Sequence, residues 1–124
     1  MTMTPRILLT GVILELTLAT AIIHFTLGGT LFLLNAAGYV ALGAAYLIAV
    51  ASPMPAIRRL SWLPRVGLAA YASVTIVAYL VIGPYFTLGW VTKGIEVAIV
   101  MLVIADLRIW TDAGRASRRP PRSA

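Results

Sequence analysis

The sequence has no cysteine among its 124 residues and only one histidine. Without cysteine there is no disulfide framework, thiol nucleophile or iron–sulfur cluster. One histidine is too few for a typical metal site or a bis-histidine haem site. We therefore expect neither a metal nor a cofactor.

Charged residues are also scarce, at 11% of the chain, whereas about a quarter is usual for a soluble domain. Hydrophobic residues make up 60%, and the mean hydropathy is +0.95. So little polar surface does not cover a water-soluble globule. The composition predicts one membrane-embedded domain, with the lipid bilayer as its main surroundings.

A transmembrane helix needs about 17 to 25 predominantly apolar residues. Four stretches meet this requirement and predict helices at 7–27, 30–51, 66–82 and 86–109. The predicted fold is therefore all-α, an integral membrane four-helix bundle. We expect the first helix to remain uncleaved, because Glu15 interrupts the apolar region that a signal peptide would need.

The connections between these helices differ in kind. Gly28-Gly29 and Gly83-Pro84 make two short turns, whereas the loop 52–65 contains three prolines that stop one helix and start the next. We expect the four-helix domain to cover residues 1–112. Residues 113–124 carry little to bury and predict a disordered basic tail.

The nine arginines predict the orientation, because positive residues stay on the cytoplasmic side. They lie at the N-terminal end, in the loop 52–65 and at the C-terminal end, and the two glycine turns have none. Both termini are thus expected inside (N-in and C-in) in the cytoplasmic, inner membrane of a bacterial type. The net charge of +6 is then explained by the orientation of the chain in the membrane, and no nucleic-acid partner is expected.

Glu15 is the acidic residue predicted nearest the middle of the membrane, where a charge costs about 2.5 to 3.5 kcal/mol. It shares a face with Gly11 and Ala19, and small residues allow helices to pack closely in lipid. We expect Glu15 to face another helix, protonated or hydrogen-bonded by a neighbour such as Tyr39 or Thr75.

A second polar group is expected in the outer half of the bundle. Lys93 and Glu96 are three residues apart, a spacing that favours an ion pair on one helix face. Residues of similar depth on other helices would complete this site. The full set of candidate site residues is Glu15, His24, Asn35, Tyr39, Thr75, Tyr79, Lys93 and Glu96.

Each of these residues also has a structural interpretation. A lone histidine is more often satisfied in a core than catalytic, tyrosines commonly join helices by hydrogen bonds, and an intrahelical ion pair is often inert. Asp106 is expected to pair locally, near Arg108 and Trp110.

Two resemblances accompany these patterns. Gly11-Val-Ile-Leu-Glu15 and His24-Phe-Thr-Leu-Gly28 are similar to the first helix of the small multidrug resistance transporters, in which such a glutamate binds protons and cationic drugs in turn. The resemblance covers the first 25 residues or so. The Trp and Tyr pattern of that family's later helices is absent and the loop charges are strongly biased, so its mechanism is not transferred to this chain.

The second resemblance spans all four predicted helices. The motifs that carry it are Glu15, His24-Phe-Thr-Leu-Gly28, Phe32-Leu-Leu-Asn-Ala-Ala-Gly-Tyr39, Val74-Thr-Ile-Val77 and Leu88-Gly-Trp-Val-Thr-Lys93-Gly-Ile-Glu96. Together they resemble a family of small, uncharacterised four-helix prokaryotic membrane proteins. This resemblance implies no activity, but it groups His24, Asn35, Tyr39, Lys93 and Glu96.

Three functions remain open at this level. The first is a small transporter or proton-coupled module that works as an oligomer. The second is a non-catalytic accessory subunit that docks its small-residue faces onto a partner membrane protein. The third, least favoured by the motifs, is an intramembrane enzyme with His24 and Glu96 as acid and base.

Overall fold

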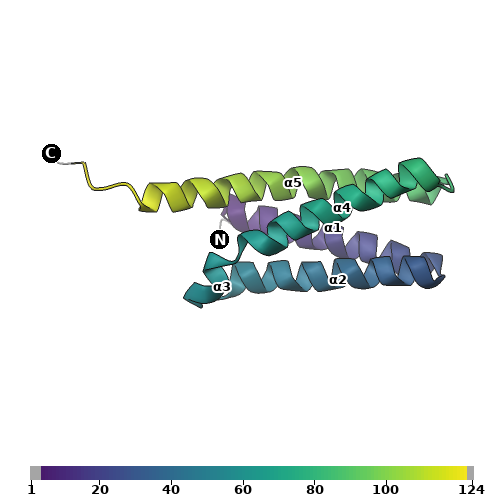
Figure 1. Cartoon of the computed structure of the whole chain (residues 1–124), viewed down its shortest axis with the longest axis horizontal. Coiled ribbons are helices and arrows are strands. Elements are labelled where there is room, and N and C mark those ends of the chain that lie inside the picture. Colours follow the sequence, from purple (N-terminus) through teal and green to yellow (C-terminus); the bar gives the residue numbers. More distant parts are fainter. Residues whose placement is uncertain (1–3, 123–124) are drawn as a thin grey trace.

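The computed structural model describes residues 4–122, and all regular secondary structure within that range is helical (Figure 1). Its elements are α1 (Pro5–Leu27), α2 (Thr30–Ala51), α3 (Pro55–Arg59), α4 (Trp62–Ile82) and α5 (Thr87–Ser117). All except the short α3 are long and apolar enough to cross a bilayer. The chain is thus a multi-pass membrane protein with four candidate spans.

The four long helices form a ring in which α1 and α4 each pack against both α2 and α5. The two glycine turns lie at one end of the bundle, which we call the turn end (Figure 1). Gly28, Gly29 and Gly83 have φ values of 72°, 83° and 69° there, a region that side chains disfavour. The short α3 lies at the opposite end with both chain termini, and we call this the arginine end.

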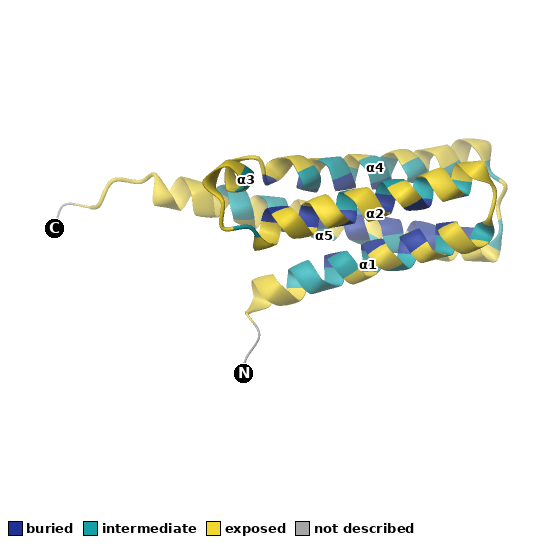
Figure 2. Ribbon diagram, turned by 90° about the horizontal axis from the view of Figure 1, so that it is seen from below, coloured by how far each residue is buried: buried dark blue, intermediate teal, exposed yellow. Residues whose placement is uncertain are grey.

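The buried residues line the inner faces of the helices, and the outer faces are exposed along the bundle (Figure 2). Large apolar side chains are exposed all along the outer faces, whereas the buried set includes His24, Arg65, Lys93, Glu96 and Asp106. Such a surface is compatible with lipid, and the interior charges require partners because each is costly there.

Two helix boundaries differ from the prediction by more than two residues. α4 begins at Trp62, because Pro64 falls in its first turn, where the backbone N–H that proline lacks has no helical partner. α5 continues to Ser117, so the expectation of a tail from residue 113 is wrong. The helix continues through the polar segment and ends before Pro120 and Pro121.

Candidate functional site

Glu96 of α5 is fully buried in the half of the bundle nearer the turn end. Its Oε1 accepts a hydrogen bond from the Tyr39 hydroxyl at 2.8 Å, and the Thr20 hydroxyl lies 3.4 Å from the same oxygen. Its Oε2 is 2.5 Å from Nζ of Lys93. Three helices thus supply donors to one carboxylate.

Lys93 forms the ion pair that its spacing from Glu96 predicts. Only 8% of the residue is exposed. Its Nζ also donates to the carbonyl oxygen of Thr75 at 3.3 Å and lies 5.4 Å from the centre of the Tyr79 ring. The ammonium is therefore held inside the bundle and does not extend to the membrane surface.

His24 approaches Glu96 from α1. Its Nδ1 is 2.7 Å from the carbonyl oxygen of Thr20, and because a carbonyl only accepts, Nδ1 carries the hydrogen. The other ring nitrogen, Nε2, lies 3.8 Å from Oε1 of Glu96. In a neutral ring Nε2 has no hydrogen, so two hydrogen-bond acceptors, Nε2 and Oε1, would face each other unfavourably. A proton shared between these two atoms would allow a hydrogen bond instead.

We refer to Thr20, His24, Tyr39, Thr75, Lys93 and Glu96 as the glutamate cluster. Tyr39 and Thr75 were expected beside Glu15, but Tyr39 contacts Glu96 and Thr75 contacts Tyr39. The direction of the side chains explains how the cluster forms, because helical side chains lean toward the N-terminus of their own helix. Tyr39 and Glu96 lean toward the turn end, whereas Thr20 and His24 on the oppositely directed α1 lean the other way and meet them.

A cavity of about 330 Å³ lies beside this cluster, and we call it the turn-end cavity. Its polar wall includes His24, Asn35, Thr75 and Lys93. The remaining wall is mainly apolar and includes Leu31, Leu34, Val74 and Ile82, four side chains that are at least 64% exposed on the outside of α2 and α4. The cavity therefore borders the membrane-facing surface between these two helices.

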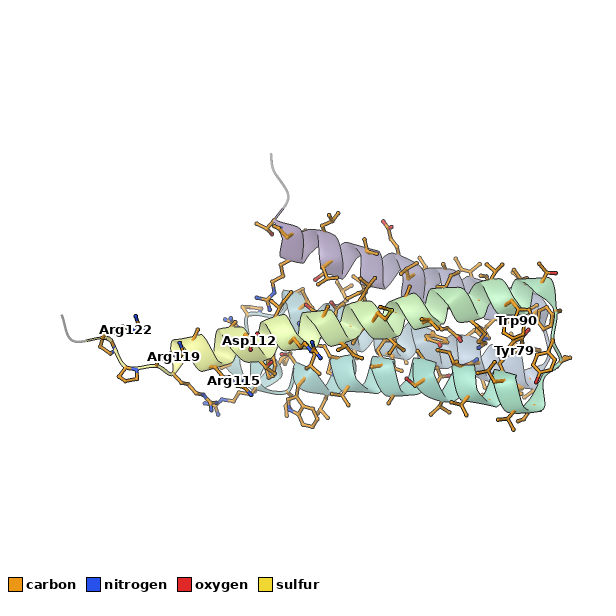
Figure 3. The ribbon with its side chains drawn as sticks, turned by 90° about the horizontal axis from the view of Figure 1, so that it is seen from above. Tyr79, Trp90, Asp112, Arg115, Arg119 and Arg122 are labelled. Carbon is orange, nitrogen blue, oxygen red and sulfur yellow. The ribbon has the colours of Figure 1, made fainter. Side chains whose placement is uncertain are left out.

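Tyr79 and Asn35 line this cavity, but they contribute less directly than expected. The Tyr79 hydroxyl donates to the carbonyl oxygen of Phe86 at 3.2 Å, and its ring packs edge to face on Trp90 near the turn end (Figure 3). Asn35 contributes its backbone carbonyl, which accepts from Tyr71 at 3.1 Å. Both residues therefore shape the cavity wall.

The structure does not bring Glu15 into the cluster. Glu15 is exposed on the outer face of α1, and the Tyr39 and Thr75 hydroxyls contact each other at 3.0 Å while Tyr39 donates to Glu96. The expectation that Glu15 faces another helix of the bundle is wrong for this single chain. Glu15 is two residues from each of Ile13 and Thr17, which are buried, so it projects from the opposite side.

A second buried ion pair was not predicted. Nε of Arg65 donates to Oδ2 of Asp106 at 2.7 Å, and the Tyr46 hydroxyl donates to the same oxygen at 3.0 Å. Arg65 also donates to the carbonyl oxygen of Ser61 at 2.7 Å. Asp106 thus pairs with an arginine 41 positions away and not with Arg108.

This aspartate cluster (Tyr46, Ser61, Arg65 and Asp106) lies toward the arginine end. Between it and the glutamate cluster the core is mainly apolar, with Ile13, Leu68, Ala72, Ile99 and Val103 all fully buried. The one buried hydroxyl of α1 at this level, that of Thr17, donates to the carbonyl oxygen of Ile13 in its own helix.

Comparisons with family models, curated proteins and solved structures find no match to this chain.

Proposed function

We propose that this protein is a proton-coupled transport module that carries an amphipathic anion together with a proton. The observation that supports it best is the Lys93–Glu96 pair, which is buried beside the turn-end cavity with the Lys93 side chain in the cavity wall. Ionisable groups inside a membrane span are costly, and for that reason they usually mark a functional site.

The charges of the cluster suggest how the coupling works. With Glu96 ionised, Lys93 is neutralised by its Oε2 at 2.5 Å and has little attraction for a second anion. A proton that binds at Glu96 releases Lys93 to pair with an anionic group in the cavity. The empty site and the site loaded with both proton and anion then have the same net charge, whereas either ligand alone leaves an unbalanced charge at low dielectric.

The proton is best held between His24 and Glu96. Oε1 of Glu96 faces Nε2 of His24 at 3.8 Å, and an imidazole nitrogen and a carboxylate oxygen can share one proton. The Thr20 carbonyl keeps the other ring nitrogen occupied, so Nε2 is the atom left to share the proton. This arrangement couples His24 to Lys93 through one carboxylate.

The cavity suggests the shape of the ligand. Most of its wall is apolar, it borders the membrane-facing surface between α2 and α4, and its volume of about 330 Å³ lies at the small end of ligand pockets. A molecule with a short hydrocarbon part and one anionic group fits these features.

The expected oligomer has one supporting observation. Glu15 is exposed near the middle of α1, about 15 Å from its first residue. A carboxyl group facing lipid at that depth is costly, and contact with a second copy of the chain would shield it. The arginine distribution supports N-in and C-in in the cytoplasmic membrane.

Reconstitution of the purified chain into vesicles tests the function. Lumenal pH is followed with a trapped dye while an inward pH gradient is combined with a panel of short-chain carboxylates and other small anionic amphiphiles. Proton entry that requires both an anion and Glu96, and that disappears in Glu96→Gln but persists in Asp112→Asn, a change at an exposed acid outside both clusters, supports the proposal. Equal proton entry in wild type and Glu96→Gln contradicts it.

The accessory-subunit function remains a second candidate because the same exposed Glu15 could pair with another membrane protein. Ala37, Ala41, Ala44 and Ala45 are also exposed along α2 and would permit close helix docking. If the reconstituted chain moves no solute or protons and a pull-down from native membranes recovers a stoichiometric partner, this function is favoured.

A further inference from the structure

A second cavity, of about 530 Å³, lies at the arginine end, and the transport proposal does not use it. It is bordered by α1, the end of α2, α3, the start of α4 and Trp110 of α5. Figure 2 shows why space exists there: α1 diverges from the other helices toward its N-terminus. We call it the arginine-end cavity.

Three arginines from three different helices line this cavity: Arg6, Arg58 and Arg65. Arg65 is neutralised by Asp106. Within residues 4–122, neither Arg6 nor Arg58 forms an ion pair with an acidic side chain. The cavity therefore has two uncompensated positive charges.

The rest of the wall is amphipathic. Hydroxyl groups of Thr10, Ser52 and Ser61 line the cavity and can donate hydrogen bonds to an oxyanion. Ile7 is also part of the wall and is 59% exposed, as is Val50 at 36%. The polar interior is thus continuous with the apolar outer surface of α1 and α2.

From these features we propose that the arginine-end cavity binds the phosphate headgroup of an anionic phospholipid, with the acyl chains along the exposed apolar faces of α1 and α2. Guanidinium groups match phosphate oxygens in geometry and charge. Basic pockets between helices on one side of a membrane are suited to anionic headgroups. A free phosphate would satisfy the arginines but would leave the adjoining apolar surface unused.

Arginines that only set topology need to lie on one side of the membrane, but they do not need to share a cavity. The chain offers a matched control for this difference. Arg115 and Arg119 are on the same end of the molecule but extend beyond the bundle, away from the cavity (Figure 3). The double variants Arg6→Gln/Arg58→Gln and Arg115→Gln/Arg119→Gln remove the same net charge.

The test is a titration of the full chain, in neutral detergent, with phosphatidylglycerol, phosphatidylcholine or inorganic phosphate, monitored by native mass spectrometry. We expect one phosphatidylglycerol to bind at least tenfold more tightly than phosphatidylcholine. Arg6→Gln/Arg58→Gln should weaken it at least tenfold and Arg115→Gln/Arg119→Gln less than twofold. Excess inorganic phosphate should not displace the lipid.

Two results would overturn the assignment. Equal loss of binding in both double variants would mean that the lipid responds to overall charge and not to this cavity. Displacement by inorganic phosphate at concentrations similar to the lipid would identify a soluble phosphate as the ligand. All four substituted arginines are exposed, so circular dichroism should report the same helicity for the wild type and the two double variants.

Discussion

Nε2 of His24 and Oε1 of Glu96 face each other at 3.8 Å across the interface of α1 and α5, with both side chains buried. The distance is too long for a hydrogen bond, yet no described side chain other than Thr20 and Tyr39 donates to that carboxylate oxygen. One proton added between these two atoms would therefore alter the hydrogen bonding of both side chains.

The first prediction concerns the histidine tautomer. Because the Thr20 carbonyl is 2.7 Å from Nδ1, we expect the neutral ring to have its hydrogen on Nδ1 and none on Nε2. His24 is the only histidine, so ¹⁵N-histidine labelling gives one set of signals in lipid. A neutral ring with the hydrogen on Nε2 would contradict the proposed proton position.

The second prediction concerns the Lys93–Glu96 pair. Removal of one partner of a buried pair costs about 3 to 5 kcal/mol, more than removal of both. Lys93→Met should therefore lower the unfolding free energy more than Lys93→Met/Glu96→Gln, as measured by reversible denaturation in bicelles.

The single variant Glu96→Gln completes the comparison. If the effects of Lys93→Met and Glu96→Gln add up to that of the double variant, the two side chains do not interact as the structure has it. Glu15→Gln provides a control in the same helix bundle, because Glu15 is exposed and outside the cluster. We expect it to change the unfolding free energy of the monomer by less than about 1 kcal/mol.

The third prediction concerns the Arg65–Asp106 pair. Asp106→Asn retains the shape but removes the charge that neutralises Arg65, so we expect a loss of about 3 to 5 kcal/mol. Arg65→Met/Asp106→Leu should lose less than the single variant. Arg108→Gln is the control, because Arg108 is exposed and has no ion-pair partner among residues 4–122. An equal loss in Arg108→Gln would restore the local pairing that the sequence favours.

The sequence predicted the four spans well because long apolar runs bounded by glycine and proline have few alternatives in a bilayer. It also predicted the Lys93–Glu96 pair, which depends only on helical spacing. The Arg65–Asp106 pair depends on how α4 sits against α5, and a local pattern does not encode that. The same limit explains Glu15, whose small-residue neighbours suggested a helix contact that this chain does not make.

The fourth prediction uses two glycines in otherwise similar helical positions. A Cβ on Gly38 would collide with the hydroxyl of Tyr71, whereas a Cβ on Gly94 would meet no atom within 4 Å. Tyr71 donates to the Asn35 carbonyl and lines the turn-end cavity. Gly38→Ala should therefore lower the unfolding free energy by about 1 to 3 kcal/mol, while Gly94→Ala should leave it unchanged or raise it slightly. Equal effects would mean that α2 and α4 are not this close.

The last prediction is the orientation, which follows from nine arginines at one end and a single lysine in the other half. Since the chain has no cysteine, single cysteines can be introduced and labelled with a membrane-impermeant maleimide. The glycine turns are poor positions because their φ values are positive, and Ser61 is buried. Thr30→Cys and Thr87→Cys are exposed alternatives at the turn end, and Met54→Cys and Ala113→Cys are exposed at the arginine end.

With both termini inside, Thr30→Cys and Thr87→Cys should label in intact cells, and Met54→Cys and Ala113→Cys only after permeabilisation. The reverse pattern would put the turn-end cavity on the cytoplasmic side and the proposed phospholipid site in the outer leaflet, whereas labelling of all four in intact cells would mean that the chain inserts in both directions.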